Sequence, residues 1–294
     1  MKSNTGYPRK VESISEVPGE FPDALRSHVS SADAARLILY APPTSVGDEK
    51  VRESVLVVTN DGWLAATDNQ ETGISVEQCK FNDTLFLELT SILLWGQLKI
   101  DFACAGTSYT AITRFNTVQE DLYREAIDLI LDGIDRTHAI GSEKDRRAAE
   151  VLRDWPLKFR NEVLRYLPKG QRLSAAAQWP AILGGFRREL APAGALLVTE
   201  RELVLIADEK TPDWYRGEWA KYGGIITYFP LTRLDDFHVG RQDRFGVLAL
   251  HVHASHGGER LEILFPSDHE RVVSEAMEQT RPVKTRETGA PIAA

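Results

Sequence analysis

Two stretches of the chain share one pattern of apolar and polar residues. Val55–Asp68 and Ala195–Asp208 each begin with an apolar run that ends in Val-Thr, pass through a short polar turn, and close with a second apolar run and an aspartate. Two apolar runs around a tight polar turn are typical of adjacent antiparallel strands. Each stretch is therefore predicted to be a β-hairpin, and the chain contains this hairpin twice.

The repetition extends beyond the hairpins. Matched positions include Leu25 and Leu164 at a spacing of 139, Val57 and Leu197 at 140, Asp68 and Asp208 at 140, and Gly96 and Gly246 at 150. A spacing that is nearly constant on either side of one main change is what a tandem duplication followed by an insertion of about ten residues leaves behind. The inserted stretch, residues 209–224, begins directly after the second hairpin.

Each half of the repeat continues with strands and ends in a helix. In Gln97–Cys104 and in Arg244–Ala254, apolar and polar residues alternate, which is the period of a half-buried strand. Thr117–Ile134 and Ser267–Thr280 instead carry one apolar stripe at helical spacing. A Thr or Ser followed three residues later by Glu predicts a capping box at the start of each helix. Each half is thus expected to hold about six or seven antiparallel strands and one amphipathic helix.

Such a unit is a partly open barrel with a helix at its end. The chain in this respect resembles tandem bacterial pleckstrin-homology-like (PH-like) domains, over residues 25–137 and 164–280. The resemblance rests on the two Val-Thr hairpins, on Tyr228–Asp236 as a middle strand, and on the terminal helices. It implies an α+β fold that is mainly β, with two PH-like partly open antiparallel β-barrels. A lipocalin-like or other small barrel with a terminal helix is the competing fold.

The predicted boundaries follow from the repeat. Two barrels are expected at 21–137 and 164–280, joined by a helical linker at 138–163, in which Pro156 interrupts the helical pattern and a second helical stretch begins at Leu157. Residues 1–20 and 281–294 are polar, contain proline and lack periodicity. They are expected to be flexible tails.

Charge separates the two halves of the chain. Residues 1–140 contain 12 Lys and Arg against 21 Asp and Glu, whereas residues 141–294 contain 23 against 22. The first half should therefore avoid polyanions, and only the second half is free to approach phosphate or anionic lipid. No nucleic-acid partner is expected.

The cysteines and the apolar segments indicate a cytoplasmic protein. Cys79 and Cys104 are too few for a disulfide framework and lack metal-ligand spacing, so both are expected to be buried strand thiols in a reducing compartment. The N-terminus has no apolar core of the kind that a signal peptide needs. The most apolar stretch, Leu85–Trp95, contains Glu88 and is too short to span a membrane.

The inserted stretch is the first candidate for a binding surface. It combines aromatic and basic side chains of the kinds that serve protein contacts, membrane interfaces and base stacking. The candidate binding residues are Trp214, Tyr215, Arg216, Trp219, Lys221 and Tyr222. Tyr215, Trp219 and Tyr222 also share one helical face, so a short helical loop packed onto the barrel is the alternative interpretation. Trp214 lies off that face and is freer to contact a partner.

A second candidate is the loop between the first two predicted strands of the second unit, which contains Phe186, Arg187 and Arg188. The resemblance implies a role for this loop, because the same loop of phosphoinositide-binding PH domains supplies basic residues to inositol phosphates. The chain lacks the strand-borne Lys-then-Arg spacing of those lipid binders. We therefore expect at most weak contact with an acidic partner.

Three histidines, His251, His253 and His256, form the only candidate metal motif. Histidines two residues apart on a strand point to the same face and could share a metal ion. The motif is similar to that of metallo-β-lactamase-type enzymes, but Ser255 stands where that motif has Asp. Because the alternating apolar residues take the inward face, the first two histidines should face solvent. A polar strand face leading to a turn is therefore expected, and no metal site.

The motifs of nucleophilic, nucleotide-dependent and cysteine-histidine enzymes are missing from the sequence. We therefore expect no catalytic residues and no cofactor. The predicted function is a non-enzymatic binding or scaffold protein that contacts a protein partner, or a second copy of itself, through the aromatic-basic insertion. Two alternatives stay open: a peripheral module on anionic membranes, and a metal-dependent hydrolase that uses the three histidines.

Overall fold

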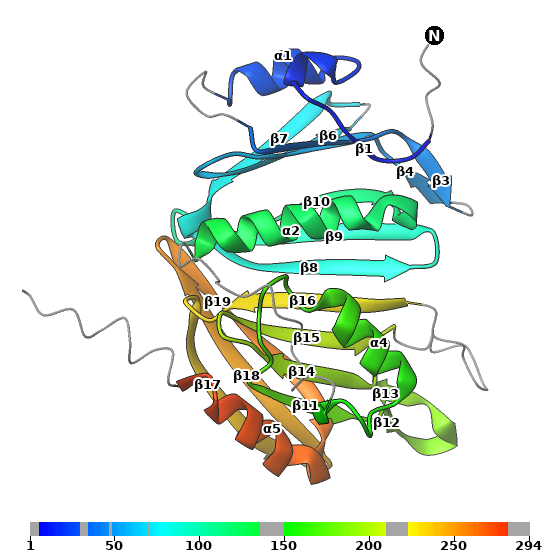
Figure 1. Cartoon of the computed structure of the whole chain (residues 1–294), viewed down its shortest axis with the longest axis vertical. Helices are drawn as coiled ribbons and strands as arrows, with labels where there is room; N and C mark the ends of the chain where they lie inside the picture. The colour runs from blue at the N-terminus through cyan, green and yellow to red at the C-terminus, as the bar shows by residue number, and fades with distance from the viewer. Residues whose placement is uncertain are drawn as a thin grey trace, which may run out of the picture. The chain divides into compact units, whose positions relative to one another are not determined.

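The computed structural model describes residues 6–29, 35–46, 49–69, 71–135, 150–209 and 223–281. The chain divides into two compact units, Met1–Thr137 with Ala254–Gly257, and His138–His253 with Gly258–Ala294. Both units consist mainly of antiparallel strands with a few helices (Figure 1). The prediction of a mainly β chain with helices is confirmed. The strands form separate open sheets and do not close into barrels.

The first unit contains a five-stranded sheet in the order β1-β2-β5-β6-β7, a small β3-β4 hairpin, and the three neighbouring strands β8, β9 and β10. Its strands are β1 (Arg9–Lys10), β2 (Leu37–Ala41), β3 (Thr44–Val46), β4 (Glu49–Val51), β5 (Ser54–Val58), β6 (Gly62–Asp68), β7 (Ile74–Lys80), β8 (Thr84–Ile92), β9 (Trp95–Cys104) and β10 (Thr107–Asn116). Its helices are η1 (Ile14–Glu16), α1 (Phe21–Arg26), η2 (Phe81–Asp83), η3 (Thr117–Gln119) and α2 (Glu120–Ile134).

The second unit contains the neighbouring strands β11, β14, β15 and β16, a small β12-β13 hairpin and a three-stranded sheet, β17-β18-β19. Its strands are β11 (Ala175–Trp179), β12 (Ile182–Leu183), β13 (Glu189–Ala191), β14 (Gly194–Val198), β15 (Glu202–Asp208), β16 (Gly223–Pro230), β17 (Leu234–Gln242), β18 (Phe245–Ala254) and β19 (Gly257–Pro266). Its helices are α4 (Leu157–Tyr166), η4 (Gly185–Arg187), η5 (Ser267–His269) and α5 (Glu270–Glu278).

The two units repeat the same order of elements at the spacings seen in the sequence. The predicted hairpins are confirmed as β5-β6, where Val58 pairs with Trp63, and as β14-β15, where Val198 pairs with Leu203. β5 and β6 begin 140 residues before β14 and β15, and β8, β9 and β10 begin 150 residues before β17, β18 and β19. One early match does not hold, because Leu25 is fully buried whereas Leu164 is exposed.

The turns of the two hairpins share one pattern of hydrogen bonds. The hydroxyl oxygen of Thr59 accepts hydrogen bonds from the amides of Asp61 and Gly62, and that of Thr199 accepts them from the amides of Arg201 and Glu202. These bonds fix the tight turn of each hairpin, since a side-chain acceptor satisfies turn amides that no strand pairs. The threonine that both hairpin sequences share is therefore a turn-forming residue.

The start of α2 corrects the predicted capping box. The 3-10 turn η3 directly precedes α2, and Asn116, not Thr117, caps it: the Asn116 side-chain oxygen accepts a hydrogen bond from the amide of Val118 at 3.0 Å. The Thr117 hydroxyl instead donates to the carbonyl of Leu93. In the second unit, Ser267 accepts a hydrogen bond from Arg241 and caps nothing. The repeated Ser/Thr-x-x-Glu pattern thus predicts where each helical segment starts, but the Ser or Thr side chain does not make the predicted capping hydrogen bond.

Residues 6–20 pack onto the first unit, in contrast to the tail expected at residues 1–20, of which residues 1–5 lie outside the described residues. β1 pairs with β2, and Lys10 forms an ion pair with Glu125 of α2 at 2.6 Å. Val17, Phe21 and Leu25 are buried in an apolar cluster on one face of the five-stranded sheet, which α1 covers in Figure 1. The face of the sheet that α1 covers is therefore buried in an apolar core that the N-terminal segment completes.

The predicted linker and C-terminal tail are described only in part. The helix expected from Leu157 is confirmed as α4, with Pro156 at its N-cap. Residues 136–149 and 282–294 lie outside the described residues.

Candidate functional site

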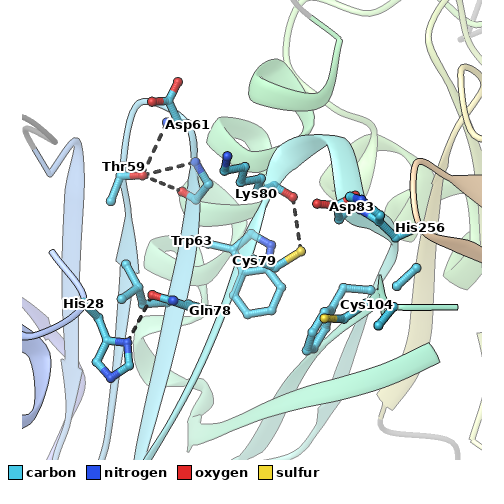
Figure 2. Close-up of a pocket in the computed structure, with 15 residues that line it drawn as sticks. His28, Thr59, Asp61, Trp63, Gln78, Cys79, Lys80, Asp83, Cys104 and His256 are labelled. Carbon is cyan, nitrogen blue, oxygen red and sulfur yellow. Dashed lines mark hydrogen bonds and ion pairs between the residues drawn. The ribbon is translucent and has the colours of Figure 1, made fainter. Parts of the chain in front are cut away.

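A pocket of about 630 Å³ opens in the first unit, where the β5-β6 turn, β7 and the end of β9 approach one another (Figure 2). Segments far apart in the sequence contribute to it. Its lining residues include Asp61, Trp63, Leu64, Gln78, Cys79, Lys80, Asp83, Phe102, Ala103 and Cys104, together with His28 and His256. A pocket of this size with apolar walls and a few polar groups is the usual form of a ligand site.

An aromatic pair forms the apolar wall of the pocket. The rings of Trp63 on β6 and Phe102 on β9 meet edge to face, with centroids 5.3 Å apart. The Trp63 indole nitrogen donates a hydrogen bond to the Thr84 hydroxyl at 2.9 Å, which satisfies its polar atom and fixes the ring. Both rings are largely buried. The pocket therefore has a rigid aromatic surface.

Polar side chains surround this aromatic surface. His28 and Gln78 share a hydrogen bond of 3.1 Å, and His256 contacts Asp83 at 2.7 Å between Nδ1 and Oδ1 (Figure 2). Lys80 is exposed, and within the described ranges its ammonium group makes neither an ion pair nor a hydrogen bond. The lysine is therefore a cation available to a ligand at this pocket.

The two cysteines also line this pocket, contrary to the expectation of buried strand thiols. Cys104 is exposed and Cys79 is partly exposed. The Cys79 thiol donates to the carbonyl of Lys80 at 3.2 Å. Cys104 is the last residue of β9, at the turn into β10, and it is exposed there although Leu98, Ile100 and Phe102 on the same face are buried.

The second unit lacks the groups that characterise this pocket. At the repeat spacings, Leu203 replaces Trp63, Val252 replaces Phe102 and Pro230 replaces Lys80. The aromatic pair and the free cation therefore belong to the first unit alone, although the fold is shared. The sequence pattern missed these residues. The signal that could have found them is the difference in residue type between aligned positions of the repeat.

The predicted binding residues of the insertion, Trp214 to Tyr222, lie outside the described residues. The ends of the insertion are described. Lys158 on α4 contacts the Asp208 carboxylate at 2.7 Å and donates to the Gly223 carbonyl at 3.1 Å. One lysine thus joins the last residue of β15 to the first residue of β16, and holds the two ends of the insertion together.

Glu162 lies beside this lysine and has an unusual pKa. Burial raises the pKa of Glu162 to about 7, the Lys158 ammonium at 3.7 Å opposes that rise, and the Asp208 carboxylate adds to it. The carboxyl group can therefore carry a proton near neutral pH, because the charged form is poorly solvated there.

The loop of Phe186, Arg187 and Arg188 forms the single turn η4 between β12 and β13. The Phe186 side chain is 99% exposed, and its φ of 56° lies in the left-handed region. Arg188 is exposed as well.

The three histidines separate into two groups. His251 and His253 are exposed on β18 on either side of buried Val252, which confirms their outward orientation. His256 instead lies in the turn that belongs to the first unit and faces Asp83. Among the residues that the structure describes, no group of three His, Cys, Asp or Glu side chains is placed to hold a metal ion.

No protein-family model matches the chain, and no curated protein matches it either. Within the described segments, none of the helices has both the length and the apolar composition that crossing a membrane requires.

Proposed function

We propose that the chain is a non-enzymatic binding protein built from two PH-like units. The order of elements supports this fold, since each unit has four neighbouring antiparallel strands and a small hairpin, followed by three further strands and a final helix. A fold alone does not define a function. The functional proposal therefore rests on the pocket of the first unit.

The observation that carries the proposal is that Lys80, whose ammonium group is free within the described residues, lines the same pocket as the aromatic pair Trp63 and Phe102. An aromatic wall favours a flat or apolar ligand body, and an available ammonium group favours an acidic substituent on that body. The ligand class is therefore an apolar or aromatic acid, of the size that a pocket of about 630 Å³ can enclose.

Calorimetric titration with naphthalene-2-sulfonate tests this proposal. We expect the wild-type protein to bind this probe, and Lys80→Met to weaken binding by about tenfold, because a charge-assisted contact contributes about 1.5–3 kcal/mol before solvent screening. Trp63→Leu, which places the residue of the second unit in the first, should weaken both the sulfonate and the neutral 2-naphthalenemethanol. Lys80→Met should leave the neutral probe unaffected.

A matched control separates this site from general electrostatic attraction. Lys169→Met removes an exposed lysine of the second unit and should not change binding of either probe. Equal affinity of wild-type and Lys80→Met protein for the sulfonate would contradict the assignment of the pocket.

The aromatic-basic insertion is the second candidate surface, for a protein partner. The observation that favours it is that Lys158 contacts both described ends of the insertion, at Asp208 and Gly223. Affinity capture that compares wild type with Trp214→Ala plus Trp219→Ala, followed by binding of the purified partner, tests this role. Pelleting with anionic vesicles at low salt, lost in Phe186→Ala, would instead support the membrane alternative.

A further inference from the structure

Three exposed apolar side chains cluster at the β8-β9 turn of the first unit. Leu93 is 65% exposed, Leu94 is 53% exposed, and Val118 at the start of the final helix is 54% exposed. The Thr117 amide donates to the Leu94 carbonyl at 3.2 Å, and the Thr117 hydroxyl donates to the Leu93 carbonyl. These bonds join the β8-β9 turn to η3, and the exposed side chains of Leu93, Leu94 and Val118 are here together named the leucine turn.

The leucine turn carries a conformational cost that the second unit avoids. Leu93 adopts a φ of 51°, in the left-handed region that leucine rarely occupies. The equivalent residue 150 positions later is Asp243, whose φ of 54° is well suited to aspartate. Arg244 and Asp268 take the places of Leu94 and Val118. The second unit thus builds the same turn from charged residues, and the apolar surface is specific to the first unit.

The second unit has the opposite feature, an apolar pocket of about 260 Å³. It lies where the start of β14, the end of β15 and the end of β19 meet. Its lining residues are mainly apolar, including Leu190, Pro192, Ala193, Leu205, Ala207, Ile263 and Leu264. In the first unit the equivalent positions of Pro192, Ala193 and Leu264 are Arg52, Glu53 and Arg114. This pocket is therefore specific to the second unit.

The two features share an apolar character. Exposed leucine and valine side chains are stabilised by transfer into an apolar pocket, and the second unit offers one. The first unit has 12 Lys and Arg against 21 Asp and Glu, a formal charge of −9, whereas the second has 23 against 22, a charge of +1. Contact between unlike units of two copies therefore avoids the repulsion of two acidic units.

We propose that the leucine turn of one copy binds the apolar pocket in the second unit of another copy. The contact uses different surfaces on the two copies, so it is heterologous and produces closed rings or open chains. Exposed apolar clusters of this kind mark interaction sites in proteins that are otherwise polar on the surface. The occupant is thus a second copy of this chain.

Exchanging residues between the units tests the contact. Leu93→Asp with Leu94→Arg gives the leucine turn the residues of the second unit, and Ala193→Glu with Leu264→Arg gives the pocket the residues of the first. Light scattering after size exclusion should show wild-type assemblies larger than one chain of 32.9 kDa. Each variant alone should have the mass of a single chain, with a dissociation constant raised at least about tenfold.

Mixing the two variants is the decisive step. The turn variant keeps its pocket and the pocket variant keeps its leucine turn, so an equimolar mixture should form a dimer of one copy of each. Leu157→Asp with Leu164→Arg is the matched control, because these leucines of α4 are 60% and 61% exposed. This control should assemble as the wild type does.

Circular dichroism and thermal melting establish that every variant is folded. A wild-type chain that stays monomeric at high concentration overturns the proposal. So do assemblies that persist in either exchanged variant, or a mixture of the two that yields no dimer. Failure of the naphthalene-sulfonate site would leave this contact unaffected, since no residue is common to both.

Discussion

At the residue scale, Glu162 shows how burial changes the chemistry of one side chain. The group faces Lys158 on its own helix and Asp208 on β15, and the Gly224 backbone lies beside it. Burial raises its pKa from 4.5 to about 7. The folded protein therefore binds a proton between these values that the unfolded chain releases. The contribution of Glu162 to the free energy of unfolding accordingly falls as pH rises from about 4.5 to 7.

Glu162→Gln should remove this pH dependence. At pH 8 we expect the variant to raise the free energy of unfolding by about 1–2 kcal/mol, because the neutral amide avoids the cost of a poorly solvated charge and part of that cost is screened by solvent. At pH 5 the effect should be small. Urea unfolding at both pH values measures the difference.

Glu275→Gln is the control for this prediction, since its side chain is 62% exposed on α5. It should change the stability little at either pH. A Glu162→Gln variant that is less stable than wild type at pH 8 would show that the ion pair with Lys158 outweighs burial.

At the element scale, a glycine and a phenylalanine lock the last two strands of each unit. A β-carbon on Gly96 would lie 2.5 Å from the Phe115 ring, and one on Gly246 would lie 2.1 Å from the Phe265 ring. Both phenylalanines are fully buried and fill the space left by the glycine on the neighbouring strand. The repeat thus preserves a close contact that no larger residue permits.

Gly246→Ala should lower the free energy of unfolding by about 1–3 kcal/mol, because the added methyl group forces the buried Phe265 ring to move. Thermal denaturation measures the loss. Gly185→Ala is the matched control, since a β-carbon there meets no atom within 4 Å. Equal melting temperatures of the two variants would mean that the ring adapts without cost.

Sequence patterns predicted the helices and strands well where the spacing of apolar residues indicated the same element in both halves of the repeat. Both hairpins, the alternating strands and α4 were found from residue periodicity alone. Residues 1–20 were predicted to be a tail although Val11, Ile14 and Val17 begin a series, continued by Phe21 and Leu25 of the predicted barrel, that recurs every three or four residues. Pro18 and Gly19 interrupt that series, and its partner is a sheet face formed much later in the chain. The pattern was present, but the surface it covers was not visible locally.

The candidate pocket could not be predicted from local patterns. Trp63 and Phe102 each occupy an apolar strand position that a core would also explain, and only the folded chain brings them together with Lys80. His28 and His256 reach the same pocket from opposite ends of the sequence. A comparison of the aligned halves of the sequence does identify Trp63, Phe102 and Lys80, because each differs in residue type from its equivalent in the second unit.

At the scale of the whole molecule, the two units share one order of elements but differ in many of the residues that these elements carry. The shared positions are those of turns and packing, such as Thr59 and Thr199. The positions that differ include buried ones, such as Trp63 against Leu203, and exposed ones, such as Leu93 against Asp243. The same order of elements therefore carries different surfaces and different pocket linings in the two units.

The final prediction concerns the N-terminal segment, which extends the first unit beyond the repeated fold. Phe21 is 1% exposed and packs in the cluster that covers the outer face of the five-stranded sheet. Phe21→Ala should lower the free energy of unfolding by about 3–5 kcal/mol, because a large buried side chain is replaced by a cavity. Phe186→Ala makes the same substitution at a side chain that is 99% exposed and should leave stability unchanged. Equal melting temperatures of both variants and the wild type would mean that the cluster around Phe21 adds no stability; earlier melting of Phe21→Ala alone would show that this cluster belongs to the core of the first unit.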